Sequence, residues 1–264
     1  MANALTRILE YKHGEVAALK VSTSIAELET RAASQSAPRG FARALTETAD
    51  TGNNALICEL KRKSPSAGEI LPGADPIEIA REYERGGASC LSVLTDGPSF
   101  GGSLEDFAKI RNAVALPMLR KDFMIDPIQI LEARAHGADA ILIIMAALDN
   151  SQAEELETAA LSCGMDALIE VHNEDELERA MTLRSSLLGI NNRDLTRMTT
   201  DLSVTERLAN MIRDEKHLVS ESGIKTPQDI SRLRNVGAKR YLIGENLMKS
   251  SDRVQAVRAL LTAQ

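Results

Sequence analysis

The chain has 264 residues, of which 44% are hydrophobic, and its formal net charge is −7. This length and apolar content suffice for a large buried core, either in two modest domains or in one α/β barrel. The acidic balance, and an aromatic content of 3% without tryptophan, argue against wholesale binding of nucleic acid or an anionic membrane. No apolar run approaches the ~20 residues of a membrane helix, and residues 1–14 lack the apolar stretch of a signal peptide. We therefore expect a cytoplasmic protein that binds neither nucleic acid nor membrane.

Residues 1–50 carry apolar side chains at helical spacing and show no clear strand. Leu5, Ile8 and Leu9 fall on one helical face, and the segment 36–40 breaks the pattern with a proline and a glycine. We predict two or three helices here that pack onto the remainder of the chain. They are expected to form an N-terminal extension that caps a single domain comprising residues 1–264.

From Ala55 onward, short apolar segments alternate with amphipathic helical patterns. Asp75-Pro76 and Thr226-Pro227 each give a polar N-cap followed by proline, which is a clear helix start. Glycine-bearing helix ends recur near multiples of about 25 residues, which indicates a repeated βα unit. The pattern predicts a closed (β/α)8 TIM barrel, because a doubly wound sheet would show a glycine-rich first turn. The predicted strands are 55–60, 91–94, 117–120, 140–144, 167–171, 187–190, 218–220 and 241–243.

Polar residues follow most of the predicted strands, at the barrel end where active sites lie. Taken singly, each could be a helix cap or half of a weak surface ion pair. Glu59 and Lys61 are two residues apart, so both side chains point to the same face of the first strand. Recurrence on six strands indicates a catalytic rim. These strand ends carry Glu59 and Lys61, 120–122, Glu170, 191–194, 220–223 and 244–246.

The loops after the first and the last two strands are rich in glycine, serine and backbone N–H groups. Ser222-Gly223 and Gly244-Glu245 lie where barrels of this type often hold a phosphate, and the turn after Ser64 suits an anion. We expect a phosphorylated small-molecule substrate. No Ser-His-Asp set, Walker loop or metal cluster is apparent, so proton transfer without metal or cofactor is predicted. Of the four histidines only His172 could reach the rim, beside a predicted helix cap.

Five motifs follow one another along the chain, at residues 59–66, 119–123, 168–172, 189–195 and 220–224. Together they resemble the indole-3-glycerol-phosphate synthase family, and the resemblance covers nearly the whole chain. It implies a carbon–carbon lyase of tryptophan biosynthesis on a barrel fold. Such enzymes close the indole ring of 1-(2-carboxyphenylamino)-1-deoxyribulose 5-phosphate and release carbon dioxide and water.

The resemblance also implies roles for individual residues. Lys121 matches the general acid that protonates the ribulose carbonyl oxygen, and Glu170 matches the group that transfers a proton during dehydration. Lys61 matches a second catalytic lysine, with Glu59 as the carboxylate that directs it. Asn191 matches a polar group that orients the substrate hydroxyls.

The remaining implied residues bind the substrate. Ser222 is expected to orient hydroxyl and phosphate groups, and Arg193 suits the anthranilate carboxylate. Ser64 and Ser66 belong to a mobile first loop that would cover the substrate. The phosphate is expected on the backbone of Gly223, Gly244 and Glu245, with the Glu245 carboxylate turned away.

Two other functions remain open from the residues alone. A phosphosugar isomerase would share the phosphate end, with Glu59 and Glu170 as its acid and base, although Lys61 and Lys121 fit ring closure better. A catalytically idle barrel would bind phosphate without turnover. The protein is expected to be a monomer or homodimer, with possible contacts to other tryptophan-pathway enzymes.

Overall fold

The computed structural model describes residues 4–65, 68–194, 199–212 and 216–263, so the predicted site residue Ser66 lies outside the described residues. Within the described leader, three helices precede the first strand, as expected. They are α1 (Ala4–Ser22), α2 (Ile25–Ser34) and α3 (Phe41–Asp50). Ser24 caps α2 because its side chain accepts a hydrogen bond from the Glu27 backbone N–H.

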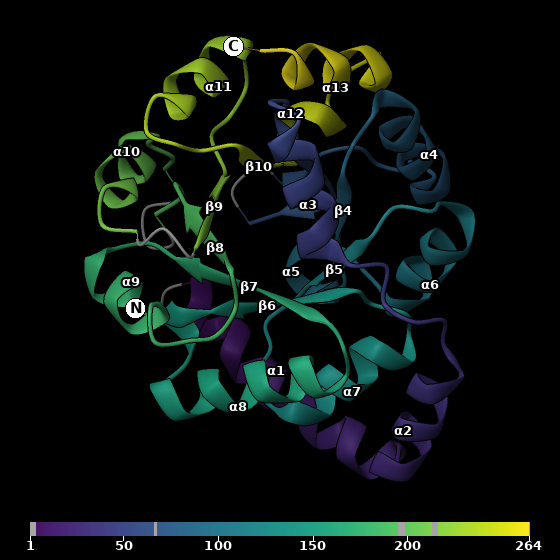
Figure 1. Ribbon diagram of the computed structural model, residues 1–264. Coiled ribbons are helices and arrows are strands. Elements are labelled where there is room, and N and C mark those ends of the chain that lie inside the picture. The colour runs from purple at the N-terminus through teal and green to yellow at the C-terminus, as the bar shows by residue number, and fades with distance from the viewer. Residues whose placement is uncertain (1–3, 66–67, 195–198, 213–215, 264) are drawn as a thin grey trace.

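Eight parallel strands in the described part of the chain close into a barrel, with helices on the outside (Figure 1). Their order around the barrel is β1-β10-β9-β8-β7-β6-β5-β4, and the sheet closes where β1 pairs with β4. The predicted TIM barrel is confirmed, and each predicted strand boundary lies within one residue of the observed one. The strands are β1 (Ala55–Leu60), β4 (Cys90–Leu94), β5 (Met118–Lys121), β6 (Ala140–Ile144), β7 (Asp166–Val171), β8 (Leu187–Asn191), β9 (His217–Glu221) and β10 (Arg240–Ile243).

Helices connect successive strands and bury their apolar faces against the outward-facing strand side chains. Two predicted helix starts are confirmed, since Asp75 and Thr226 accept hydrogen bonds from backbone N–H groups in the first turns of α4 and α11. A short hairpin of β2 (Lys63–Ser64) and β3 (Gly68–Glu69) follows β1. The connecting helices are α4 (Pro76–Gly86), α5 (Gly97–Phe100), α6 (Leu104–Ala113), α7 (Pro127–Ala135), η1 (Met145–Ala147), α8 (Asn150–Ser162), α9 (Glu174–Ala180), α10 (Ser203–Ala209), α11 (Pro227–Arg234), α12 (Glu245–Met248) and α13 (Arg253–Leu261).

The barrel interior is apolar at one end and charged at the other. Ile57, Leu119 and Val219 fill the apolar end, where they belong to one buried cluster with Phe41 and Leu45 of α3. Figure 1 shows α3 lying across the barrel at this end. Because strand side chains alternate between faces, the next inward position along each strand lies above this apolar layer. Several of those positions are ionisable, so the sequence places buried charge at the carboxyl ends of the strands.

Helix α1 packs near the opposite end from α3. Leu5 and Ile8 contribute to the cavity at the carboxyl ends of the strands. Lys12, only 2% exposed, pairs with Asp96 at 3.0 Å and with Asp122 at 2.8 Å, which ties α1 to the loops after β4 and β5. The leader thus contacts both ends of the barrel. None of the described helices has the length and apolar character of a membrane span.

Candidate active site

A cavity of about 110 Å³ opens at the carboxyl ends of the strands, above the apolar interior. Five strands each contribute one inward-facing polar side chain to its lining. They are Glu59 from β1, Lys121 from β5, Glu170 from β7, Asn191 from β8 and Glu221 from β9. The two-residue alternation of each strand delivers these groups to one place, so the predicted gathering of Lys61, Lys121 and Glu170 around one cavity is confirmed.

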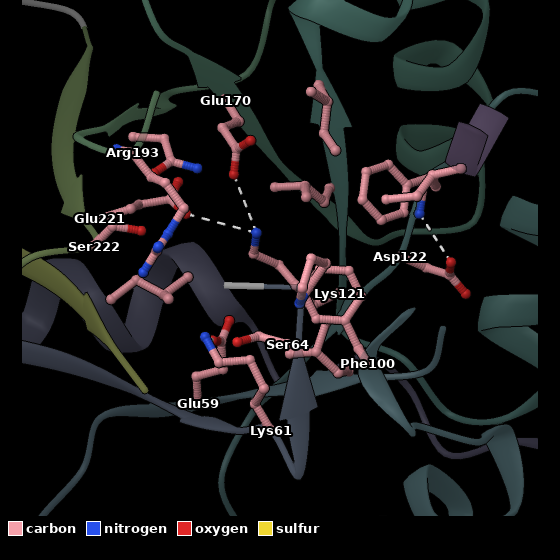
Figure 2. A pocket seen from close by; sticks show the side chains of 18 of the residues that line it. Glu59, Lys61, Ser64, Phe100, Lys121, Asp122, Glu170, Arg193, Glu221 and Ser222 are labelled. Atoms are coloured by element: carbon pink, nitrogen blue, oxygen red, sulfur yellow. Dashed lines mark hydrogen bonds and ion pairs between the residues drawn. The ribbon is translucent and has the colours of Figure 1, made fainter. Parts of the chain in front are cut away.

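Lys121 lies at the centre of this group, and its ammonium faces several carboxylates. Lys121 Nζ lies 3.1 Å from Glu170 Oε2 and 3.8 Å from Glu221 Oε2, and Figure 2 shows both carboxylates pointing toward it. Burial alone would lower the pKa of Lys121, but Glu170, Glu221 and Glu59 together raise that pKa above its usual value. Lys121 is therefore charged at neutral pH and carries a proton that it can donate.

Glu59 and Lys61 form the second ion pair of the site, as predicted. Lys61 Nζ lies 2.8 Å from Glu59 Oε1, and the Ser92 hydroxyl donates to Glu59 Oε2 at 3.3 Å. Burial opposes ionisation of Glu59, yet Lys61 and Lys121 lower its pKa below the ordinary value. Both members of the pair are thus ionised, and Glu59 fixes the direction in which Lys61 points.

The pKa values of Glu221 and its neighbour Glu170 are shifted in opposite directions. Burial and the adjacent Glu170 charge raise the pKa of Glu221 well above its usual value, whereas Lys121 and His172 lower the pKa of Glu170 despite its burial. Of the two carboxyl groups, Glu221 therefore holds a proton more tightly than Glu170. Gly189 leaves room for the Glu221 carboxyl group, because a Cβ there would lie 2.1 Å from Glu221 Oε1.

Glu221 is an ionisable lining residue that the sequence prediction of the site omitted. It directly follows the predicted strand 218–220, in the run 220–223, without an assigned role. The signal that could have found it was available, since Val219 and Glu221 alternate in the same way as Ile57 and Glu59. An inward carboxyl two residues after an inward apolar side chain is the pattern shared by these strands.

A second, adjoining cavity of about 460 Å³ lies over the ends of β9 and β10. Its lining includes Gly223, Gly244 and Glu245, and it shares Lys61, Arg193 and Ser222 with the first cavity. The predicted phosphate-binding segments therefore lie together, next to the predicted catalytic lysine.

Charged side chains border this second cavity. Glu245 Oε1 accepts a hydrogen bond from Lys249 Nζ at 2.7 Å, while Glu245 Oε2 lies 3.9 Å from Arg193 Nη2. Lys249 lowers the pKa of the Glu245 carboxyl. Ser222 has a φ of 65°, a left-handed conformation that is uncommon for residues other than glycine. Arg193 thus lies where it borders both cavities, and a strained residue lies at their junction.

An apolar wall completes the first cavity, and sequence reasoning did not predict it. Phe100, at the end of α5, and Phe123 line the cavity, with their ring centroids 6.1 Å apart. Leu5 and Ile8 of α1 add further apolar surface. Ser64 in β2 lines the same cavity, as predicted for the first loop. A planar apolar group can therefore lie against this wall while polar groups reach the carboxylates and lysines.

Among the described residues, no cluster of three or more His, Cys, Asp or Glu side chains could hold a metal ion. The chemistry available to the described side chains is proton transfer. Lys121 lies 3.1 Å from the carboxylate of Glu170 and 3.8 Å from the carboxyl group of Glu221, and the raised pKa of Glu221 favours its protonated form. Such a set can both donate and accept protons at neutral pH.

Known proteins resemble this chain over almost its whole length. The family model of indole-3-glycerol phosphate synthase matches residues 5–260. The indole-3-glycerol phosphate synthase of Hyphomonas neptunium is 62% identical over 264 residues, covering 100% of both chains. That of Rhodospirillum rubrum is 53% identical over 262 residues, covering 99% of this chain and 100% of its own.

Among solved structures, a thiamine phosphate pyrophosphorylase from Pyrococcus furiosus superimposes with a TM-score of 0.57 at 15% identity. The match covers 78% of this chain and 93% of that one, and at this identity it supports the fold alone. The family model and the two relatives span almost the entire sequence at high identity. The chain therefore belongs to the indole-3-glycerol phosphate synthase family.

Proposed function

We propose that this chain closes the indole ring of 1-(2-carboxyphenylamino)-1-deoxyribulose 5-phosphate, with Lys121 as general acid and Glu170 as general base. The observation that carries these roles is the opposite protonation of the two side chains, which lie 3.1 Å apart in one cavity. A charged lysine supplies a proton, and an ionised carboxylate takes one up.

Lys121 acts in the ring closure. The aromatic carbon that bears the carboxylate attacks the ribulose carbonyl carbon, and a carbon–carbon bond forms. The carbonyl oxygen takes the proton from Lys121 Nζ as its charge develops. Carbon dioxide then leaves from the attacking ring carbon, and the electrons of the broken bond restore the aromatic ring.

Glu170 acts in the dehydration that comes next. The C–O single bond that remains at the former carbonyl carbon breaks, and the hydroxyl leaves as water after it gains a proton from a lysine ammonium. Glu170 accepts the proton from the adjacent carbon, which completes the double bond of the indole. Lys61, held by Glu59 at the junction with the second cavity, is positioned as the second lysine of this step.

The two cavities divide substrate binding. The phosphate occupies the larger cavity near Gly223 and Gly244, where Lys61 and Arg193 supply positive charge. The anthranilate ring packs against the apolar wall that includes Phe100. Arg193 borders both cavities, so its guanidinium reaches the anthranilate carboxylate or the phosphate, and Ser222 and Asn191 orient the hydroxyl groups.

The organisation of the protein beyond the site agrees with the same proposal. The helices of residues 1–50 contact both ends of the barrel, which supports one domain comprising residues 1–264 with a helical extension. A monomeric or homodimeric state, contacts with other tryptophan-pathway enzymes and a cytoplasmic location stay predictions.

Turnover of the purified protein tests the proposed function. Added carboxyphenylamino-deoxyribulose phosphate should give the fluorescence of an indole product, and the gene should restore growth of a tryptophan auxotroph that lacks this step. A phosphosugar isomerase would rearrange a phosphosugar without an indole signal. An idle barrel would bind phosphate and release no carbon dioxide. Absence of both indole and carbon dioxide would refute the proposal.

A further inference from the structure

His172 contacts the proposed base from outside the cavity. It follows β7 two residues after Glu170, and its Nε2 lies 3.4 Å from Glu170 Oε1. Lys121 holds the other oxygen of the same carboxylate, since its Nζ lies 3.1 Å from Glu170 Oε2. His172 is absent from the residues that line the first cavity. The imidazole therefore acts on Glu170 without a direct contact to a bound substrate.

The imidazole is itself held in place by α9. His172 Nδ1 lies 3.0 Å from Glu176 Oε2, and the backbone N–H of His172 donates to the same oxygen at 2.9 Å. Asn173 Nδ2 donates to Glu176 Oε1 at 2.7 Å, which fixes the carboxylate of Glu176. The ring is thus fixed between two carboxylates, one from α9 and one from the active site.

Burial strengthens the electrostatic interaction between His172 and Glu170. The His172 side chain is 11% exposed, and its buried Nε2 has no hydrogen-bond partner among the described residues, so its contact with Glu170 Oε1 at 3.4 Å is an ion pair only. Burying a polar nitrogen without a hydrogen bond costs free energy. The attraction between Nε2 and the charged carboxylate of Glu170 offsets this cost, which accounts for the orientation of the ring.

The charged groups that face His172 are Glu170, Glu176 and Lys121. Burial lowers the pKa of His172, but Glu176 and Glu170 outweigh burial and the Lys121 charge, and raise that pKa above its usual value. The reverse effect acts on Glu170, whose pKa is lowered by Lys121 and by His172. Each of the two groups therefore stabilises the charged form of the other.

We propose that His172 is a positioning residue for Glu170: as an imidazolium held by Glu176, it fixes Glu170 Oε1 and keeps that carboxylate ionised as a base. The inference rests on the proposed function only in calling Glu170 the base. It explains how the carboxylate of Glu170 remains ionised in a buried site next to a second carboxyl group, that of Glu221. Lys121 supplies one cation and His172 supplies the second, on opposite oxygens of Glu170.

The pH dependence of turnover tests this role. His172→Gln keeps a polar side chain but removes the positive charge, so Glu170 should require a higher pH to ionise. We expect the acid limb of the kcat profile to move up by about 1 pH unit, with KM changed less than about twofold. The control His13→Gln alters an exposed histidine of α1 and should leave the profile unchanged. An unshifted acid limb in His172→Gln would overturn the proposal.

A titration that needs no turnover separates this inference from the proposed function. The imidazole resonances of His172 in the intact protein report its protonation, with those of His13 as an internal reference. In Glu170→Gln the anion facing Nε2 is lost, so His172 should titrate at least about 0.5 pH unit lower. The same His172 titration in both proteins would refute the coupling. If His172 titrates lower in Glu170→Gln but the natural protein makes no indole, only the proposed function would be refuted.

Discussion

Replacing Lys121 with methionine removes the cation that the carboxylates of the site share. Glu170 lies 3.1 Å and Glu221 3.8 Å from its ammonium, and Glu59 adds further negative charge. A general acid contributes about 10²- to 10⁴-fold to a rate, so we expect kcat to fall by at least that factor. KM should change little, because Lys121 does not line the second cavity, where we propose that the phosphate binds.

The same substitution should also destabilise the fold, although Lys121 lies at a strand end. Breaking a buried ion pair at one side costs about 3–5 kcal/mol, and proton uptake by Glu170 keeps the cost near the lower value. At roughly 2–4 °C per kcal/mol for a chain of this size, Tm should fall by about 6–12 °C. If Lys121 were an exposed residue at the rim of the barrel without buried partners, its replacement would leave Tm almost unchanged.

The pH dependence of this loss has a defined sign. The folded pKa of Lys121 is raised, so its contribution is fully present below the unfolded pKa and is lost as pH rises through the folded value. The folded pKa of Glu170 is lowered, so its contribution is present above the unfolded value and is lost as pH falls. The Tm difference between the natural protein and Lys121→Met should therefore be large at neutral pH and narrow below about pH 5.

Lys121→Arg is the matched control for charge. Arginine keeps the positive charge near Glu170, yet its pKa above about 12 makes it a poor proton donor. We expect Lys121→Arg to retain most of the thermal stability and to lose indole formation, measured by fluorescence at saturating substrate. Substantial turnover in either variant would refute Lys121 as the acid. Equal Tm losses in both variants would refute the electrostatic account of stability.

Three further substitutions, the first with a matched control, test other parts of the structure. Lys12→Met removes a buried cation that two buried aspartates share and should cost about 3–5 kcal/mol in urea unfolding, whereas Lys20→Met, at an exposed pair, should cost less than about 1 kcal/mol. Gly189→Ala places a Cβ 2.1 Å from Glu221 Oε1 and should lower kcat about 10- to 100-fold at nearly unchanged Tm. Ser222→Gly relieves the left-handed φ of 65° and should stabilise the fold by about 1 kcal/mol in urea while KM rises, since a hydroxyl is lost.

The fold and much of the site were predictable because strands impose a strict alternation. Glu59, Lys121 and Glu170 each follow an inward apolar residue by two positions, so a correct strand assignment already places their side chains in the barrel. The regular spacing of glycine-bearing helix ends indicated a repeated βα unit, and the length of that unit predicted the number of strands. Local sequence was sufficient here because the geometry of a closed barrel is regular.

Other features depend on neighbours that are distant in sequence. Lys12 has the appearance of a solvated helix lysine, and only the packed fold shows that Asp96 and Asp122 bury it. The raised pKa of Glu221 results from burial and from the nearby charge of Glu170, which lies 51 positions earlier in the chain. Protonation states are properties of the assembled cavity, so a strand pattern cannot supply them.

The charges of the first cavity indicate why substrate binding needs the guanidinium of Arg193 in addition to the two lysines. Lys61 and Lys121 balance Glu59 and Glu170, so a proton on Glu221 leaves these five side chains with no net charge. The proposed substrate brings a carboxylate and a phosphate, which this neutral set cannot compensate. Further positive charge must therefore lie outside it, and the guanidinium that borders both cavities meets that need. Ionisation of Glu221 at high pH would add a buried negative charge to the cavity. We therefore expect the affinity for the anionic substrate to weaken as pH rises.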